Sequence, residues 1–268
     1  MAHMDGTFKV VPRTTHIYQL FTIHALYMDM TFPIVYALMT RKTRRLYECI
    51  LTYLKNTLLP TVHIQSVMAD YETALRVAVV GILPGTRLRG CWFHYTKALY
   101  KKSVPLHLHN NDRTKKIVKM AMALPLLPED QFANGMETLQ GLATGNQHLM
   151  QFLNYIRRQW IPLNISVHGQ RHRTNNLVES FHRDLYRLVS RPHPNIWVLV
   201  ERLQQMEHGK SVDIGRLAEG HLLPRRRRLR QLILEQRIER AQEMLASSSD
   251  VRRFLPYMSH AVERRPCT

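Results

Sequence analysis

Strand-like and helix-like patterns alternate in the N-terminal third of the chain, and their order limits the folds that it can adopt. Three segments rich in β-branched and aromatic residues are joined by short links, which favours an antiparallel meander. Helical and extended patterns then alternate, so the predicted order is βββαβαβα. This order indicates an α/β protein with a mixed sheet and helices packed against it. The strands are expected at residues 7–11, 17–25, 34–39, 62–68 and 86–92, with helices that follow Thr43, Asp70 and Trp92.

The rest of the chain has mainly helical patterns. Every periodic segment from residue 113 to 160 has helical spacing, and we interpret this stretch as an all-helical insertion. Two more helices are expected at residues 176–190 and 195–208. Beyond Gly209, a linker leads to a basic, amphipathic helix and then to a polar, mobile tail that begins at Ala246.

The charge of the chain points to a polyanionic partner. Its 268 residues include 38 Lys and Arg against 20 Asp and Glu, a formal net charge of +18. Nucleic acid is the first candidate for the partner and an anionic membrane surface is the second. Three widely spaced cysteines, Cys49, Cys91 and Cys267, do not make a disulfide framework and favour a reducing, intracellular compartment. Neither a signal peptide nor a membrane-spanning segment is expected.

Three acidic residues are candidates for chemistry, although each has an ordinary structural interpretation. Asp5 precedes a glycine, and such a pair is most often part of a turn. Asp70 stands where a strand meets a helix and is suited to cap that helix. Glu179 lies in the first turn of the helix that follows Asn175, where the macrodipole favours it and Arg183 can pair with it. The apolar stripe of that helix is predicted at Leu177, Phe181, Leu185 and Leu188, with Glu179 on the opposite side.

Considered together, the three carboxylates have another interpretation. The predicted strand order brings neighbouring strands to one edge of the sheet, where Asp5 and Asp70 can meet Glu179 on an adjoining helix. Three clustered carboxylates repel one another unless a cation offsets their charge. Hard oxygen ligands favour Mg²⁺ or Mn²⁺ over zinc. The pattern therefore predicts a divalent metal site, while the turn, cap and ion-pair interpretations stay open.

Five motifs occur in an order that resembles a known family. DGTFKVVP begins at Asp5, and FPIVYALMTRK, MADYETAL, GCWFHYTKALYKK and TNNLVESFHRDL follow it. Together they resemble the transposase domain of Mutator-like elements (MULE), in the DDE transposase superfamily, up to about Leu188. The resemblance implies an RNase H-like fold, an α/β fold with a mixed sheet of three antiparallel strands followed by βαβα. Its expected parts are a catalytic core at residues 1–112 and 166–208, a helical insertion at residues 113–165 and a basic helical tail at residues 209–268.

The resemblance also implies roles for individual residues. Asp5, Asp70 and Glu179 correspond to the three catalytic, metal-binding carboxylates of the family. A two-metal site of this kind, with Mg²⁺ or Mn²⁺, cleaves and joins DNA strands, because only the attacking oxygen differs between the two reactions. The implied function is DNA transposition in the nucleus, with DNA as the partner and a homodimer as the working form.

Three further residues are supporting candidates. Cys91 and His94 form the CxxH pair that the family carries at this place. Zinc binding is the less favoured role for them, because zinc normally takes four ligands, and His168 and His172 would have to complete the set. Packing or support of the active site is the alternative. His182, one turn after the third carboxylate, is a candidate to contact the scissile phosphate, or else an ordinary surface histidine.

A run of arginines is the strongest candidate for contacts with the DNA backbone outside the core. A nuclear import signal and a solvated charged surface are the alternatives. The residues are Arg225, Arg226, Arg227, Arg228 and Arg230. Only four residues precede Asp5, where the family carries a DNA-binding domain, so a domesticated, catalytically silent module that binds DNA or protein is an alternative to the enzyme. An RNA-cleaving relative of the same fold is a third hypothesis.

Overall fold

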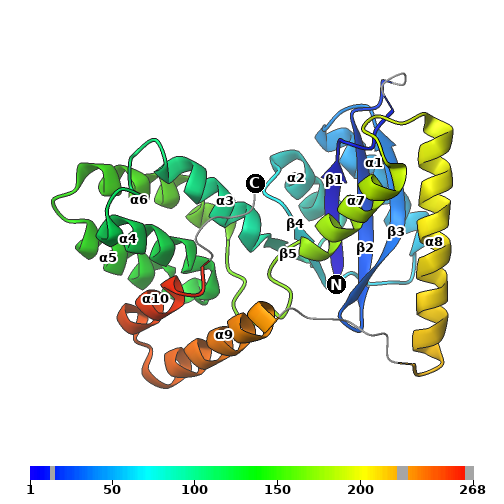
Figure 1. The fold of residues 1–268 in the computed structure, drawn as a ribbon. Coiled ribbons are helices and arrows are strands. Elements are labelled where there is room, and N and C mark those ends of the chain that lie inside the picture. The colour runs from blue at the N-terminus through cyan, green and yellow to red at the C-terminus, as the bar shows by residue number, and fades with distance from the viewer. Residues whose placement is uncertain (13–15, 222–228, 263–268) are drawn as a thin grey trace. The chain divides into compact units, whose positions relative to one another are not determined.

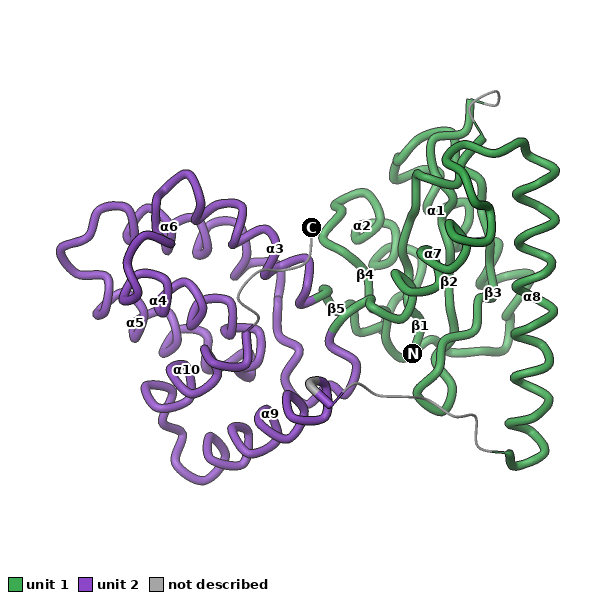
Figure 2. The backbone as a smooth tube through the Cα atoms, viewed as in Figure 1, with its two compact units in different colours: residues 1–91, 174–225 green, residues 92–173, 226–268 purple. Residues whose placement is uncertain are grey.

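The chain forms two compact units (Figure 2). The computed structural model describes residues 1–12, 16–221 and 229–262. The first unit consists of residues 1–91 and 174–225, and the second consists of residues 92–173 and 226–268. This division does not test the predicted boundaries of the core, insertion and tail, which stay predictions.

The first unit is built on a five-stranded mixed sheet (Figure 1). Its strands lie in the order β3-β2-β1-β4-β5, in which β1, β2 and β3 are antiparallel neighbours and β4 and β5 run parallel to β1. The strands are β1 (Ala2–Thr7), β2 (Gln19–Tyr27), β3 (Met30–Met39), β4 (Ser66–Ala69) and β5 (Arg87–Gly90). This arrangement confirms the predicted mixed α/β class and the order βββαβαβα.

Helices cover both faces of the sheet. On one face lie α1 (Arg44–Tyr53), which continues as the π-helix η1 (Leu54–Leu58), and α2 (Thr73–Ile82). On the other face lie α7 (Asn176–Val189) and α8 (Ile196–Ala218) (Figure 1). The core on the α1 side includes Met4, Phe21, Ile23, Tyr47 and Val79, and the core on the α7 side includes Leu20, Phe181, Leu185 and Leu199.

The first strand begins earlier than predicted. The prediction of a strand at residues 7–11 is wrong, because β1 ends at Thr7 and the next residues form a bend and a turn. Within β1, Ala2 and Met4 are buried in the core on the α1 side, whereas His3 and Asp5 contact residues of the α7 side. Polar residues that point to an interior face hide the strand pattern from sequence analysis. The correction places Asp5 inside the strand, close to its carboxyl end.

The second unit is helical throughout the elements that the structure describes. Its α-helices are α3 (Trp92–Ser103), α4 (Asp112–Met122), α5 (Phe132–Ala143), α6 (Gln147–Gln159), α9 (Leu229–Ser248) and α10 (Val251–Ser259). Short 3-10 helices lie at η2 (Leu124–Leu126), η3 (Glu129–Gln131) and η4 (Ile161–Leu163). The prediction that residues 113–160 are helical is therefore confirmed.

Two predictions for the C-terminal part are wrong. Gly209 does not begin a linker, because α8 continues through it to Ala218, and an exposed glycine is tolerated there at a modest cost in helix propensity. Residues 246–262 are not a mobile tail, because α9 ends at Ser248 and α10 follows. The buried residues of α10 recur at helical spacing and pack on the rest of the unit; they are Val251, Phe254, Leu255, Met258 and Ser259.

The edge strand of the β2–β3 hairpin begins earlier than predicted, and the sequence does not signal the type of its turn. β3 starts at Met30 and contains Pro33, which an edge strand tolerates because it does not need every backbone N–H. The hairpin turns at Met28 and Asp29, with φ values of 47° and 62°. Positive values at both positions belong to a type I′ turn, which favours asparagine and glycine. Methionine followed by aspartate gives no such signal.

Met28→Asn is expected to raise the free energy of unfolding by about 0.5–1 kcal/mol, because asparagine adopts the left-handed conformation at a lower cost than methionine. Met28 is 60% exposed, so the change removes little packing. Denaturant unfolding measures the effect, with Met28→Leu as the control. If the two variants unfold at the same denaturant concentration, the turn does not carry the expected strain.

Candidate active site

Asp5 and Asp70 lie at matching positions on neighbouring strands. β1 and β4 are parallel, with His3 opposite Met68, and the same register continued toward the strand ends puts Asp5 beside Asp70. Successive side chains alternate across a sheet, and Met4 is buried on the α1 side, so Asp5 belongs to the α7 side, where it faces His182. Both Asp5 and Asp70 are half-buried. The parallel strands β1 and β4 thus bring two predicted catalytic residues to one edge of the sheet.

The turn and cap interpretations of these two residues are wrong. Asp5 lies within β1 and not in a turn. The N-cap of α2 is Glu72, and Asp70 does not cap that helix. The Oδ1 atom of Asp70 accepts a hydrogen bond from the backbone N–H of Glu72 at 3.0 Å. This bond holds the Asp70 carboxylate directly after β4.

Asn175 joins the start of α7 to β1. Its side-chain amide donates a hydrogen bond to the carbonyl oxygen of Met4 at 3.0 Å, and its Oδ1 lies 3.1 Å from Nδ1 of His3. Asn175 occupies the predicted N-cap position, but its side chain makes no capping bond to the helix. The side chain is fully buried. Asn175 therefore fixes the helix against the strand that carries Asp5.

Glu179 lies on the same side of α7 as two residues that contact β1. At about 100° per residue, Asn175, Glu179 and His182 fall within one sector of the helix. The backbone N–H of Glu179 binds the carbonyl oxygen of Asn175 at 2.9 Å, and the residue is half-buried. Glu179 is thus close to these two residues on the helix surface, beside the buried face of α7.

The buried face of α7 differs from the predicted stripe. Phe181 and Leu185 are buried as predicted, but Leu177 and Leu188 are only partly buried. The residues buried with them are Val178, His182 and Val189. The interior face is therefore rotated by part of a turn relative to the predicted stripe, and Glu179 is still not among the buried residues of α7.

His182 links α7 to Asp5 and to β2. Its Nδ1 lies 3.6 Å from Oδ2 of Asp5, and its Nε2 lies 2.9 Å from Oγ1 of Thr22. Nε2 of His24 lies 3.1 Å from the same hydroxyl oxygen. Burial, together with nearby cationic groups, lowers the pKa of His24 to about 3, so this imidazole is uncharged at neutral pH. His182 is itself buried, so it is not a surface histidine.

Cys91 follows β5 directly in the sequence and contacts the residue before α7. Its backbone N–H binds the carbonyl oxygen of Ala69 at 3.0 Å, and its sulfur accepts the N–H of Asn175 at 3.3 Å. The preceding Gly90 lies against Tyr71, whose ring and hydroxyl would overlap a Cβ atom on the glycine. The GCWF and MADYE motifs therefore pack together at the ends of β4 and β5.

The other supporting candidates lie in the second unit. His94, on α3, meets the ring of Phe93 edge-on, with centroids 5.7 Å apart. Nδ1 of His168 lies 3.0 Å from the carbonyl oxygen of Leu126. Zinc binding by Cys91, His94, His168 and His172 stays a prediction.

The described residues contain no group of three His, Cys, Asp or Glu side chains placed to hold a metal ion. Asp5 and Asp70 lie near the carboxyl ends of neighbouring parallel strands and Glu179 lies on α7, but the structure does not gather these three described residues into such a group. Metal binding by these residues stays a prediction.

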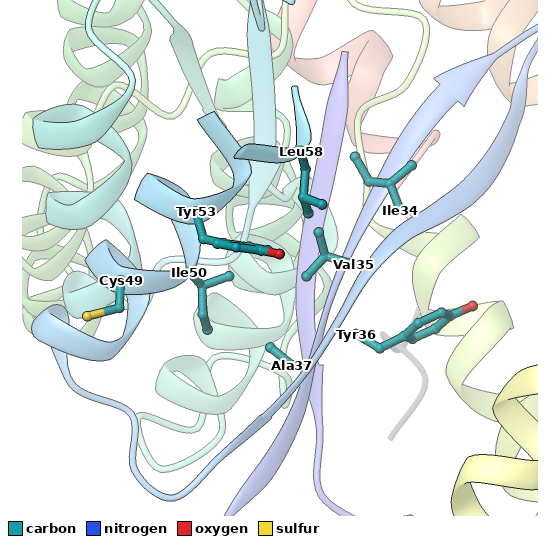
Figure 3. Close-up of a pocket in the computed structure, with 8 residues that line it drawn as sticks. All are labelled: Ile34, Val35, Tyr36, Ala37, Cys49, Ile50, Tyr53 and Leu58. Carbon is teal, nitrogen blue, oxygen red and sulfur yellow. The ribbon is translucent and has the colours of Figure 1, made fainter. Parts of the chain in front are cut away.

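An apolar hollow of about 430 Å³ lies between β3 and the segment formed by α1 and η1. Val35 and Ala37 point toward Ile50 of α1, whereas Tyr36 points away from it (Figure 3). The residues that line it are Ile34, Val35, Tyr36, Ala37, Cys49, Ile50, Tyr53 and Leu58. None of them is a predicted site residue, so this hollow is separate from the carboxylates.

The predicted DNA contacts fall mostly outside the described residues. Arg225, Arg226, Arg227 and Arg228 lie in the segment that the structure leaves undescribed, and for Arg230 only a place in α9 is known. Of the helices that the structure describes, none has both the length and the apolar character needed to cross a membrane.

Paired acidic residues at the ends of adjacent parallel strands define a candidate active site in a mixed α/β protein. Residues 1–98 match the family model of the MULE transposase domain. A comparison with curated proteins gives no match. The first 98 residues thus carry a MULE transposase domain, which confirms the predicted family and indicates a transposase-related function with DNA as partner. The matched segment includes Asp5, Asp70, Cys91 and His94, and Glu179 lies beyond it.

Sequence analysis missed the polar residues that hold this site together. The sequence marks Asn175 only as the residue before a helix, and Thr22 and His24 only as part of the strand expected at residues 17–25. One signal was present, because Thr22 and His24 alternate with apolar neighbours in LFTIHAL and so share one face of β2. A buried polar face on a central strand indicates a partner that reaches it from elsewhere in the chain.

Asn175→Ala is expected to lower the free energy of unfolding by about 2–4 kcal/mol, because it leaves polar atoms of His3 and Met4 buried without their partner. The neighbouring Asn176 is exposed, so Asn176→Ala is the matched control and should change stability little. Thermal and denaturant unfolding measure both variants. Equal stability of the two would show that the Asn175 side chain does not fix α7 to β1.

Gly90→Ala is expected to destabilise the protein by about 1–3 kcal/mol, because the added methyl group forces the Tyr71 ring to move. Gly141, which is exposed on α5 with open space around it, provides the control. Gly141→Ala should stabilise its helix by up to about 1 kcal/mol. Comparing the two in one unfolding assay separates the steric effect from the general effect of replacing glycine. A Gly90 variant as stable as the wild type would contradict the packing described for the two motifs.

Proposed function

We propose that the chain contains a DDE-type transposase catalytic core with an RNase H-like fold, which cleaves DNA strands and transfers them in DNA transposition. The observation that carries this proposal is the position of Asp5 and Asp70 near the carboxyl ends of the adjacent parallel strands β1 and β4. Ligands of open α/β sheets bind at this edge. The sheet order β3-β2-β1-β4-β5, with three antiparallel strands followed by two parallel ones, supports the RNase H-like assignment.

The proposed metal ligands are Asp5, Asp70 and Glu179, and the proposed cofactor is Mg²⁺ or Mn²⁺. Two half-buried carboxylates side by side repel each other, and a hard divalent cation relieves that repulsion. When bound, a pair of such ions supplies an activated attacking oxygen and stabilises the leaving oxygen. Glu179, on α7, is the third carboxylate in this proposal.

The surrounding residues hold the three proposed metal ligands in position. The β-sheet fixes Asp5, the bond to the N–H of Glu72 fixes Asp70, and the contacts of Asn175 with β1 fix the helix that carries Glu179. His182 faces the Asp5 carboxylate from α7. Phosphoryl transfer depends mainly on positioning and electrostatic stabilisation, so a rigid arrangement of this kind suits the reaction.

The proposed setting of the reaction is the nucleus, with a homodimer as the active form. The net charge of +18 supports binding to the DNA backbone, to which the run of Arg225, Arg226, Arg227, Arg228 and Arg230 is proposed to contribute. If it does, the logarithm of the binding constant should fall with the logarithm of salt concentration by about 0.9 per phosphate contacted.

Asp70→Ala is expected to abolish Mn²⁺-dependent nicking of plasmid DNA, because it removes a proposed metal ligand without altering the basic surface. Asp184→Ala, an exposed aspartate on α7 of the same unit, is the matched control and should nick like the wild type. Salt-sensitive DNA binding should be retained by both variants.

The same assay separates the enzyme from its alternatives. A wild-type protein that binds DNA but nicks it with neither metal would favour the domesticated, catalytically silent module. Cleavage restricted to RNA–DNA hybrids would favour an RNA-cleaving relative of the fold.

A further inference from the structure

Thr22 lies at the centre of a buried polar network between β1, β2 and α7. Its Oγ1 is 2.9 Å from Nε2 of His182, 3.1 Å from Nε2 of His24 and 3.4 Å from the carbonyl oxygen of Asp5. Thr22 is opposite Asp5 in the β1–β2 register and is itself fully buried. A hydroxyl has one proton to donate and can accept from its other neighbours. The direction of each bond in the network is therefore constrained.

The protonation of His24 determines the direction of its hydrogen bond with Thr22. It is buried and uncharged, so only one of its ring nitrogens carries a proton. Its Nδ1 has no hydrogen-bond partner among the described residues. A proton on Nδ1 would leave a buried N–H unpaired, which is rarer than an unpaired acceptor. The proton therefore belongs on Nε2, which donates to Thr22.

The second direction follows from the first. With His24 donating to it, the Thr22 hydroxyl has its own proton for one of two neighbours, the carbonyl oxygen of Asp5 at 3.4 Å or Nε2 of His182 at 2.9 Å, and the shorter contact favours His182. A His182 ring that accepts at Nε2 carries its proton on Nδ1, the atom that lies 3.6 Å from Oδ2 of Asp5. In the opposite tautomer, a nitrogen lone pair would face the carboxylate and repel it.

We propose that Thr22 is a positioning residue for Asp5: its hydroxyl selects the His182 tautomer that turns an N–H toward the Asp5 carboxylate. The chain of donors runs from His24 through Thr22 and His182 to Asp5. Hydrogen bonds to the ligands around a metal orient those ligands, and Nδ1 of His182, 3.6 Å from Oδ2 of Asp5, is placed to orient that carboxylate. The catalytic consequence rests on the proposed function, whereas the tautomer itself is a property of the folded chain.

The first test is made on the wild-type protein without metal. Long-range ¹H–¹⁵N NMR correlations identify which nitrogens of each ring are protonated. The expected result is a proton on Nδ1 of His182 and on Nε2 of His24. A proton on Nε2 of His182 would overturn the proposal, whether or not the protein cleaves DNA.

The second test compares two variants of the central hydroxyl. Thr22→Val keeps the shape but removes the hydroxyl, and Thr22→Ser keeps the hydroxyl. Thr22→Val should shift the His182 proton to Nε2 and weaken Mn²⁺ binding, measured by calorimetry, about 10–100-fold. Thr22→Ser should keep the wild-type tautomer and affinity.

The outcomes separate this proposal from the proposed function. A Thr22→Val protein that keeps both the tautomer and the Mn²⁺ affinity of the wild type contradicts the positioning role. A wild-type protein with the expected tautomers that neither binds Mn²⁺ nor nicks DNA contradicts the proposed function and leaves the tautomer selection by Thr22 supported. If Thr22→Val does not fold, the wild-type NMR result and the Thr22→Ser comparison still decide the matter.

Discussion

The bonds between Asn175 and β1 are the interaction on which the rest of the site depends. Its amide and carbonyl groups bind Met4 and His3, which precede it by more than half of the chain. They hold the start of α7 against the strand that carries Asp5. Without them, nothing in the local sequence of α7 would orient His182 toward the sheet, since the apolar residues of the helix alone allow a different rotation. A single buried side chain thus connects a helix late in the sequence to the edge of the sheet.

The face of the sheet under α7 is unusual because it is partly polar. His3, Asp5, Thr22 and His24 occupy positions where the opposite face carries Met4, Phe21 and Ile23. Burying these groups has a cost in desolvation, and the hydrogen bonds among them offset much of it. A folded protein retains such a network for stability only rarely, because apolar residues would serve as well. Its position beside two paired acidic residues supports a role in chemistry.

Much of the fold of the first unit could be predicted from the sequence, because helical and strand periodicity are local properties. The capping of α1 by Thr43, the alternation of strands and helices and the helical character of residues 113–160 all follow from such patterns. The predicted strand order also brings the ends of β1 and β4, with Asp5 and Asp70, to one edge of the sheet. The features that could not be predicted depend on contacts between residues distant in the sequence. The position of β1 depends on His3 and Asp5 facing α7, and the rotation of α7 depends on Asn175. The turn at Met28 and Asp29 has no sequence signal, and the helix α10 was hidden by the polar residues that surround its buried positions.

The central claim is that the hydrogen bonds of Asn175 to β1 hold α7 so that Glu179 can share a metal ion with Asp5 and Asp70. The most direct test is a crystal structure of the protein grown with Mn²⁺, with the metal located from its anomalous scattering. The account predicts manganese bound by oxygen atoms of Asp5, Asp70 and Glu179. Manganese bound elsewhere, with the Glu179 carboxylate directed away from the two aspartates, would contradict it.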